Sequence, residues 1–357
     1  MLGCVIDTDA KLAALLPVIK SAKWLALDTE ADSLHAYPEK VCLIQITTAA
    51  GDALIDPLGA INLDPLLDTL NAHELIMHGA DYDLRLLRKH HEFVPSAIFD
   101  TMLAARLLGE REFGLGALVE RRLGVKLDKG PQKADWARRP LTERMETYAR
   151  NDTHFLKPLA DRLKIELEQK GRLAWHQESC ARLIVETSRP PVVDADSVWR
   201  VKGSFRLGRP ALAVLRELWQ WREREALAAN RPPFFVLTHE KLVAIAAAAA
   251  SRRPVEPLLP PRLAVSSRHR DGLAAAIKTG LQLSADRHPD FLRPKGHRPT
   301  EAEMRRYREL EKIRNAHAHR LGIDPTLIAS RAALGELARD WHKHAPELMN
   351  WQHELLK

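Results

Sequence analysis

The segment Trp24-Leu25-Ala26-Leu27-Asp28-Thr29-Glu30 decides the fold class of this chain. Its four apolar residues predict a short buried strand, and the two acidic residues follow where that strand ends. Because side chains two residues apart on a strand point the same way, we expect the two carboxylates side by side. Such charges repel unless a cation lies between them, and oxygen-rich clusters suit Mg²⁺ or Mn²⁺. Taken alone, an Asp-x-Glu pair is more often a solvated turn.

The residues around this segment alternate between strand and helix patterns. Three more strands are predicted from apolar runs at 41–46, 53–55 and 75–77. The first of these is expected to pair antiparallel with the opening strand, because the connection is short. Helical spacing continues over 63–70, 82–89, 101–108, 115–123 and 144–169. Strand signals stop after residue 95, and Pro158 is expected to kink or split the last helix.

Two later segments add acidic residues to the pair. His78-Gly79-Ala80-Asp81-Tyr82-Asp83 lies at a predicted strand-to-helix junction. Only one of its two aspartates can face a site, since helical neighbours two apart differ by about 200° in direction. We expect Asp83 in the first helical turn, with Asp81 free to cap the helix. Tyr148 and Asp152 are spaced i and i+4, so they share one helix face. Alone, this pair also fits an ordinary amphipathic helix.

Taken in order, these residues resemble the DEDDy 3′–5′ exonuclease superfamily and, within it, the ribonuclease D family. The resemblance covers roughly residues 1–170. It is carried by Leu27-Asp28-Thr29-Glu30, Leu43-Ile44-Gln45-Ile46, Leu54-Ile55-Asp56-Pro57-Leu58, His78-Gly79-Ala80-Asp81-Tyr82-Asp83-Leu84-Arg85, Phe99-Asp100-Thr101, Ala134-Asp135-Trp136, Arg139-Pro140-Leu141 and Tyr148-Ala149-Arg150-Asn151-Asp152-Thr153-His154. The resemblance implies an RNase H-like fold, a mixed sheet flanked by helices.

The resemblance also implies a catalytic site with two divalent ions, Mg²⁺ or Mn²⁺. By it, Asp28 bridges both ions, Glu30 and Asp152 complete the ion near the attacking water, Asp83 holds the second ion, and Tyr148 orients the nucleophile. These five residues are the predicted catalytic set, and the four carboxylates are the predicted metal ligands.

Gln45, His78 and Trp136 are weaker candidates for substrate binding. Gln45 interrupts an apolar strand, and a satisfied core amide explains it as well as a substrate contact does. His78 stands at a strand end, where a structural hydrogen bond is favoured over metal ligation. The indole of Trp136 is expected to pack in a loop near the RNA 3′ end, and Asp100 to cap the helix that follows it.

The rear half of the chain differs in charge from the front half. Residues 1–170 hold 22 Lys and Arg against 26 Asp and Glu, whereas 171–357 hold 32 against 21. This asymmetry favours a polyanion partner for the rear half, with solvated arginines as the ordinary alternative. Its arginines, Arg222 among them, are expected to contact phosphates as a patch.

The rear half also contains an internal repeat at an offset of 92 residues. Arg222, Ala226, Pro233 and Leu242 correspond to Arg314, Ala318, Pro325 and Leu334. The first copy, with Arg231-Pro232-Pro233-Phe234-Phe235, is similar to the HRDC family of small helical nucleic-acid-binding domains. We therefore expect four parts: an exonuclease domain at 1–170, a linker at 171–204, an HRDC domain at 205–290, and a divergent HRDC-like domain at 291–357.

These patterns predict a 3′–5′ exoribonuclease that releases nucleoside 5′-monophosphates, with tRNA precursors and other small structured RNAs as partners. Two alternatives stay open, a 3′–5′ DNA exonuclease and a non-catalytic RNA-binding scaffold. No apolar run reaches the length of about 20 residues that a membrane helix needs. The scattered Cys4, Cys42 and Cys180 suit a reducing cytoplasm, where we expect the protein to reside.

Overall fold

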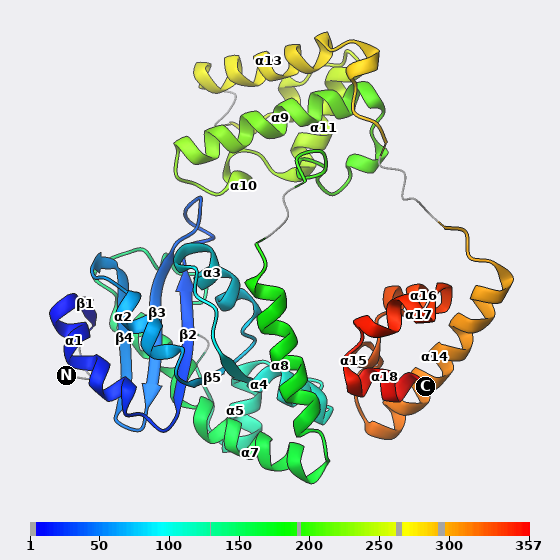
Figure 1. The fold of residues 1–357 in the computed structure, drawn as a ribbon. Coiled ribbons are helices and arrows are strands. Elements are labelled where there is room, and N and C mark those ends of the chain that lie inside the picture. The colour runs from blue at the N-terminus through cyan, green and yellow to red at the C-terminus, as the bar shows by residue number, and fades with distance from the viewer. Residues whose placement is uncertain (1–4, 129, 191–193, 262–265, 292–296) are drawn as a thin grey trace. The chain divides into compact units, whose positions relative to one another are not determined.

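The computed structural model describes residues 5–128, 130–190, 194–261, 266–291 and 297–357. The chain forms two compact units. The first contains residues 1–31, 41–190 and 297–357, and the second contains residues 32–40 and 191–296. Figure 1 gives the element labels used below.

The first unit is built on a six-stranded mixed sheet with the order β1-β4-β3-β2-β5-β6. Strands β2, β3 and β4 form an antiparallel meander, whereas β1, β5 and β6 join in parallel. The strands are β1 (Ile6–Thr8), β2 (Leu25–Ala31), β3 (Val41–Thr48), β4 (Gly51–Ala60), β5 (Glu74–Met77) and β6 (Ala97–Asp100). The predicted mixed α/β fold is confirmed, including the antiparallel pairing of the first two predicted strands.

Helices cover both faces of this sheet (Figure 1). They are α1 (Asp9–Lys20), α2 (Asp64–Leu70), α3 (Asp81–His91), α4 (Thr101–Leu108), α5 (Leu115–Leu123), α6 (Glu143–His154), α7 (Leu156–Gln169) and α8 (Leu173–Ser188). Leu25 and Leu27 of β2 share a core with α1, α2 and α3, whereas Ala26 shares a second core with α4, α5 and α7. This alternation fixes which way each following side chain of β2 points.

Two expectations about this unit need correction, and one about its last predicted helix is confirmed. Strand signals do not stop at residue 95, since the short strand β6 follows and pairs with β5. Asp81 does not cap α3; it is the first residue of that helix and forms an ion pair with Arg85. The long predicted helix is split in two, as expected from Pro158, and the break lies at Phe155, three residues before the proline. Pro158 is tolerated because the first-turn amides of a helix have no intrahelical acceptor.

Part of the predicted linker is also a helix of the first unit. Helix α8 occupies much of the range 171–204, and its His176 Nε2 lies 2.9 Å from the carbonyl oxygen of Asp100 at the end of β6. The buried Arg172 just before it donates hydrogen bonds to the carbonyls of Leu107 and Leu321, at 2.6 and 2.7 Å. The range 297–357 groups with the first unit.

That C-terminal segment is helical. It contains α14 (Glu301–Leu321), α15 (Pro325–Ile328), α16 (Arg331–Arg339), α17 (Trp341–His344) and α18 (Asn350–Leu356), with the 3-10 turn η4 (Ala345–Glu347). Trp351 of α18 stacks on Trp175 of α8 with ring centroids 5.0 Å apart. Its buried leucines belong to the same apolar core as those of α7.

The second unit is a small helical domain. It contains α9 (Arg209–Ala228), α10 (Pro233–Val236), α11 (His239–Ala250) and α13 (Ser267–Gln282), with the 3-10 turns η1 (Ser204–Arg206), η2 (Glu256–Leu258) and η3 (Ala285–Arg287). Trp221 is part of its apolar core. The loop 32–40 joins this unit through Tyr37, whose hydroxyl donates to Glu223 at 2.7 Å.

Candidate active site

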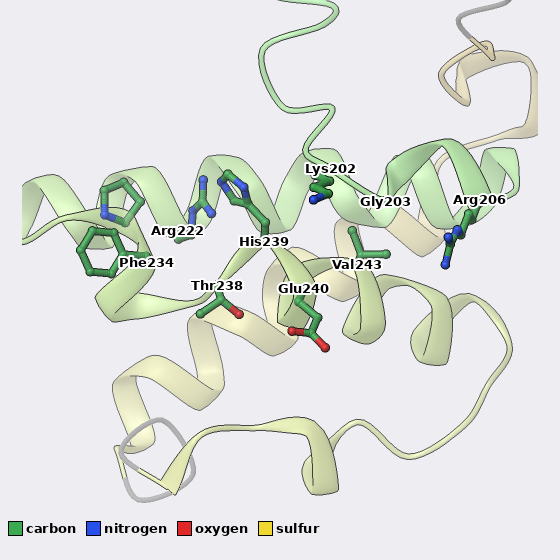
Figure 2. Close-up of a pocket in the computed structure, with 10 residues that line it drawn as sticks. Lys202, Gly203, Arg206, Arg222, Phe234, Thr238, His239, Glu240 and Val243 are labelled. Atoms are coloured by element: carbon green, nitrogen blue, oxygen red, sulfur yellow. The ribbon is translucent and has the colours of Figure 1, made fainter. Parts of the chain in front are cut away.

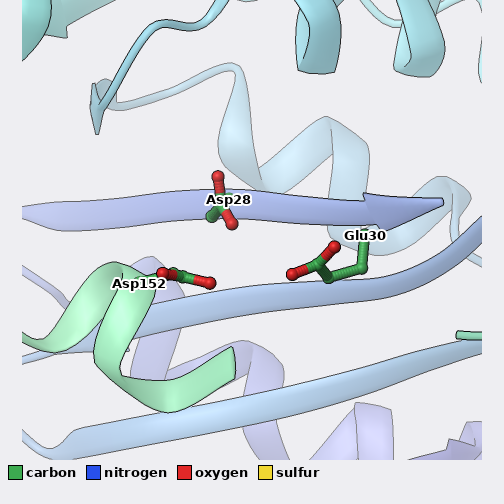
Figure 3. A group of neighbouring side chains, drawn as sticks. All are labelled: Asp28, Glu30 and Asp152. Atoms are coloured by element: carbon green, nitrogen blue, oxygen red, sulfur yellow. The ribbon is translucent and has the colours of Figure 1, made fainter. Parts of the chain in front are cut away.

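The carboxylates of Asp28, Glu30 and Asp152 come together at the sheet (Figure 3). One oxygen of each lies within 4.8 Å of the others, which is close enough for one cation to be shared. Strand β2 supplies the first two residues, and α6 supplies the third. Carboxylate oxygens are the ligands preferred by hard divalent cations. Among the described residues, this is the one His, Cys, Asp or Glu cluster with such geometry.

Helix α6 is tied to the β3–β4 hairpin at its C-terminal end. The Thr47 hydroxyl lies 2.7 Å from that of Thr153, and His154 Nδ1 lies 2.9 Å from a carboxylate oxygen of Asp52. Arg150 also donates to the carbonyl oxygen of Asp52 at 3.0 Å. These bonds hold the turn that carries Asp152 against the sheet. His154 therefore acts on the site through Asp52 and the hairpin.

Asp83 lies outside the group of three. It is buried in the first turn of α3, and its Oδ1 accepts a hydrogen bond of 2.5 Å from the hydroxyl of Thr29. It is nevertheless close enough to raise the pKa values of Asp28 and Glu30 by charge repulsion. Three of the four predicted metal ligands thus lie together, and the fourth, Asp83, lies beside them.

Burial raises the pKa of every one of these carboxyl groups, and a nearby negative charge, Asp100 in the case of Asp83, adds to the shift. Burial is the larger cause in each case, and it raises the pKa of Glu30 to about 9, of Asp152 to about 7 and of Asp83 to about 6. The pKa of Asp28 is raised in the same direction by burial and by its three acidic neighbours. A divalent cation would offset this repulsion, so the cluster has the electrostatics of a cation site.

Tyr148 lies one helical turn before Asp152 on α6, as its spacing predicts. Its side chain forms hydrogen bonds with Asp152 and with Gln132. Burial, followed by the charge of Asp152, raises the pKa of the phenol. The phenol therefore stays protonated and can donate a hydrogen bond to a group at the cluster.

Two of the three weaker candidates, Gln45 and Trp136, lie beside residues of the predicted catalytic set. Gln45 pairs directly with Asp28 across β2 and β3, and it is 0% exposed. Trp136 is also buried, with its ring 6.0 Å from that of Tyr148. His78 Nδ1 lies 2.9 Å from the Thr101 hydroxyl, and burial lowers the pKa of the histidine.

Sequence reasoning missed the residues that support the site from a distance. Arg139 forms a bidentate ion pair with Asp56, at 2.5 and 2.6 Å, and donates to the carbonyls of Trp136 and Cys42, each at 2.7 Å. It thereby fastens the loop that carries Trp136 to β3 and β4. Its sequence signal is Arg139-Pro140-Leu141, which shows a motif but not the partner 83 residues away.

Comparison with known proteins agrees with this geometry. Residues 4–168 match the 3′–5′ exonuclease domain family, and residues 211–253 match the HRDC domain family. A ribonuclease D of Cronobacter turicensis is 30% identical over 369 residues, covering 99% of this chain and 97% of that protein. The chain belongs to the ribonuclease D family. The ribonuclease D of Escherichia coli K12 is 32% identical over 246 residues, covering 68% of this chain.

Coverage differs among these ribonuclease D relatives. The alignments to those of Shewanella, Zymomonas mobilis and Escherichia coli span 63–65% of each relative's own length. The crystal structure of Escherichia coli RNase D, named there as an exoribonuclease involved in structured RNA processing, superposes with a TM-score of 0.76 and 26% identity. It covers 100% of this chain and 99% of that one. The catalytic core of Trypanosoma brucei RRP6 superposes at 0.66 with 28% identity, covering 77% of this chain and 78% of that one.

Over the residues that the structure describes, no helix has both the length and the apolar character needed to cross a bilayer.

Proposed function

We propose that this chain is a 3′–5′ exoribonuclease that hydrolyses the terminal phosphodiester bond of RNA and releases nucleoside 5′-monophosphates. The observation that carries the proposal is the cluster of Asp28, Glu30 and Asp152 with Asp83 beside it. In this reaction, water attacks the phosphorus atom and its proton is removed. The bond from phosphorus to the 3′ oxygen breaks, and that oxygen leaves and takes up a proton.

Two divalent ions, Mg²⁺ or Mn²⁺, are the proposed cofactors, and the residues present fit them. Four carboxylates with raised pKa values at one place are the donor set of such ions. When bound, the ions lower the pKa of a water molecule and neutralise charge on the leaving oxygen. Asp28, Glu30 and Asp152 would hold one ion, and Asp28 with Asp83 would hold the other.

Tyr148 is proposed to orient the attacking water by a hydrogen bond from its phenol. The protonated state of the phenol and its contact with Asp152 support this role. Gln45 and Trp136 are too buried to bind RNA directly, so we propose that they support the site from behind. His78 has its hydrogen bond to Thr101, which favours a structural role.

We further propose that the HRDC domain binds the body of the RNA. A groove of about 740 Å³ lies in this domain, with Phe234 towards one end, Arg206 towards the other, and His239 and Lys202 between them (Figure 2). Phe234 is an exposed aromatic ring, and a base can stack on such a ring while cations contact the phosphates. Arg222 also lines the groove, but its side chain is buried and pairs with Glu223. We therefore exclude it from the arginines proposed to contact phosphates.

The C-terminal segment is proposed to be a second, divergent HRDC-like domain. Arg314 of α14 repeats the position of Arg222 of α9 at the predicted offset of 92 residues. Each donates through Nη1 to a carbonyl oxygen, of Ala329 at 3.1 Å and of Leu237 at 3.3 Å, and these acceptors are also 92 residues apart. Substrates in the form of tRNA precursors and small structured RNAs, and a cytoplasmic location, complete the proposal.

The test is a time course on two 3′-tailed substrates of equal sequence, one of RNA and one of DNA. Each is incubated with Mg²⁺, Mn²⁺ or EDTA. We expect stepwise, metal-dependent loss of single nucleotides from the RNA. Equal or faster digestion of the DNA would favour a DNA exonuclease, and binding without cleavage of either would favour a scaffold.

Variants of the cluster test the site itself. Asp28→Asn and Asp152→Asn each remove a charge that a cation needs, without changing side-chain size. We expect both to lower the trimming rate by at least about 10³-fold, since metal-assisted charge stabilisation supplies several kcal/mol. RNA binding, measured by fluorescence anisotropy, should persist. A variant that still trims at the normal rate would show that the site is assigned wrongly.

A further inference from the structure

On the side away from β3, the end of β2 has the start of α3 near it in place of a neighbouring strand. Pairing with β5 is recorded at Leu25 with Leu75 and at Ala26 with Ile76, and β5 ends at Met77. The chain then turns and begins α3 at Asp81. The first turn of α3 therefore meets the part of β2 that carries the acidic residues.

Thr29 points towards this helix, away from the group of three carboxylates. It follows Leu27 by two positions, and Leu27 shares a core with Leu84 of α3. Its hydroxyl donates to Asp83 Oδ1 at 2.5 Å, and both residues are only 6% exposed. Thr29, which lies between the proposed metal ligands Asp28 and Glu30, thus forms a hydrogen bond with a third proposed ligand, Asp83.

The start of α3 is held by a second contact. Its N-cap residue, Ala80, has no side chain that can cap the helix. The carboxylate of Asp100 instead accepts the amide N–H groups of Gly79 and Ala80, at 3.1 and 2.8 Å. Asp100 also caps α4, accepting from Met102 and Leu103. One buried carboxylate therefore links the turn before α3 to β6 and α4, and it fixes the backbone of Asp83.

We propose that Thr29 is a positioning residue for Asp83. Its hydroxyl fixes the rotation of the Asp83 carboxyl group, while Asp100 holds the backbone just before α3 through the amides of Gly79 and Ala80. The inference rests on the proposed function of the cluster. The Asp83 side chain can rotate, and the charges of Asp28, Glu30 and Asp152 repel it from the cluster. A hydroxyl on the sheet that donates to one of its oxygens counters this repulsion and keeps the second oxygen in one direction.

The test replaces the hydroxyl without changing the shape of the side chain. Thr29→Val is nearly isosteric, whereas Thr29→Ser keeps the hydroxyl and loses a methyl group. We expect Thr29→Val to lower kcat on a 3′-tailed RNA by about 10- to 100-fold with KM changed by less than about twofold, because the bond has a charged acceptor. The Mn²⁺ concentration for half-maximal rate should rise. Thr29→Ser should recover most of kcat.

Thr48→Val is the matched control. Thr48 lies on β3, is also 6% exposed, and its hydroxyl accepts a backbone N–H from Ala50 at 3.2 Å. It has the same kind of side chain but no contact with a carboxylate of the cluster. We expect it to leave kcat and the Mn²⁺ requirement within about twofold of the unchanged chain. If it impairs both as much as Thr29→Val does, the effect is one of sheet stability and the inference fails.

Direct Mn²⁺ binding, measured from the electron paramagnetic resonance of free Mn²⁺, separates this inference from the proposed function. Thr29→Val should bind Mn²⁺ more weakly than the unchanged chain whether or not either cleaves RNA. Wild-type Mn²⁺ affinity and wild-type kcat in Thr29→Val would overturn the inference. Equal impairment of Thr29→Ser and Thr29→Val would also overturn it. An unchanged chain that binds Mn²⁺ but trims no RNA would instead overturn the proposed function.

Discussion

Gln45 carries an amide in a place where an apolar side chain would pack better. It is fully buried opposite Asp28, and neither of its amide atoms has a hydrogen-bond partner among the residues that the structure describes. Leaving a buried amide unpaired costs about 1–3 kcal/mol. An amide kept at this cost beside a carboxylate cluster is explained by hydrogen bonds made when cations and their water ligands are present.

Replacing Gln45 should therefore stabilise the metal-free protein and slow the reaction. Gln45→Leu removes the unpaired amide and keeps most of the volume. In EDTA we expect a melting temperature about 2–6 °C higher, and in Mg²⁺ a kcat at least about 10-fold lower. Thermal unfolding and a trimming assay on the same preparation measure both. A fully active variant would show that the amide has no part in the site.

Glu30 makes the stability of the metal-free protein depend on pH. Burial and its acidic neighbours raise its pKa from 4.5 to about 9. The folded chain therefore holds a proton on Glu30 that the unfolded chain releases at a lower pH. The stability linked to this proton is complete below pH 4.5 and is lost as the pH rises towards 9.

Glu30→Gln should abolish this dependence, because the amide is neutral at every pH. We expect the variant to melt at least about 2–4 °C above the unchanged chain at pH 8.5 in EDTA. At pH 4.5 the two should melt at nearly the same temperature. A difference independent of pH would mean that the carboxyl group titrates normally. Adding Mg²⁺ should reduce the difference, since the cation stabilises the charged carboxylate.

The catalytic candidates could be predicted because their local spacing was joined by the resemblance of their order along the chain to an exonuclease family. Asp28 and Glu30 are two residues apart on a strand, and Tyr148 and Asp152 are four apart on a helix. Thr29 and Arg139 act through partners 54 and 83 residues away, which spacing cannot reveal. Gln45 was a candidate because it interrupts an apolar run, but whether its amide finds a partner depends on packing.

At the scale of elements, most segments between residues 25 and 123 were predicted, whereas α1, β1, β6 and α8 were not. Strands β2 to β5 and helices α2 to α5 lie where the sequence places them. The missed strands β1 and β6 have three and four residues, too few to show alternation; β5 is as short but was predicted from its unbroken apolar run of Leu75, Ile76 and Met77. Helix α8 was assigned to a linker, and its only strongly buried residues are His176, Cys180 and Thr187, which show little of an apolar stripe.

The repeat of α9 to α11 in α14 to α16 extends to single hydrogen bonds. Thr238 caps α11 by accepting from Lys241, and Ser330 caps α16 by accepting from Ala333, at the same offset of 92 residues. The buried arginine of each segment, Arg222 or Arg314, donates to the carbonyl oxygen of the residue just before that cap. In both segments, a buried arginine therefore satisfies the carbonyl oxygen just before a helix cap.

Arg314→Met should therefore loosen the C-terminal segment. The carbonyl oxygen of Ala329 loses its donor, which costs about 1–3 kcal/mol for a buried group. We expect hydrogen exchange of the amides in 325–339 to quicken by about 5- to 150-fold, and those of β3 to be unaffected. Arg306→Met, an exposed position on the same helix, is the control and should change neither. Equal protection in both variants would contradict the repeat as a stabilising device.

At the scale of the whole chain, charge and chemistry are divided between segments. The proposed site lies in the acidic front half, whereas residues 191–296 hold 18 Lys and Arg against 10 Asp and Glu. An acidic site repels RNA until cations bind, so affinity has to come from elsewhere in the chain. A polyanion held by arginines and lysines releases condensed counterions, and this makes binding weaken as salt rises.

This division predicts that salt acts on KM and much less on kcat. From about 50 to 200 mM KCl at fixed Mg²⁺, KM for a 3′-tailed RNA should rise steeply while kcat changes by less than about twofold. Lys202→Ser with Arg206→Ser should reduce the slope of log KM against log salt by about 1 to 2, since each phosphate contact contributes about 1 or slightly less. Arg305→Ser with Arg306→Ser removes the same charge from α14 and is the matched comparison. If the two pairs change the slope equally, only net charge matters. If the first pair changes it more, the groove of the HRDC domain holds the RNA.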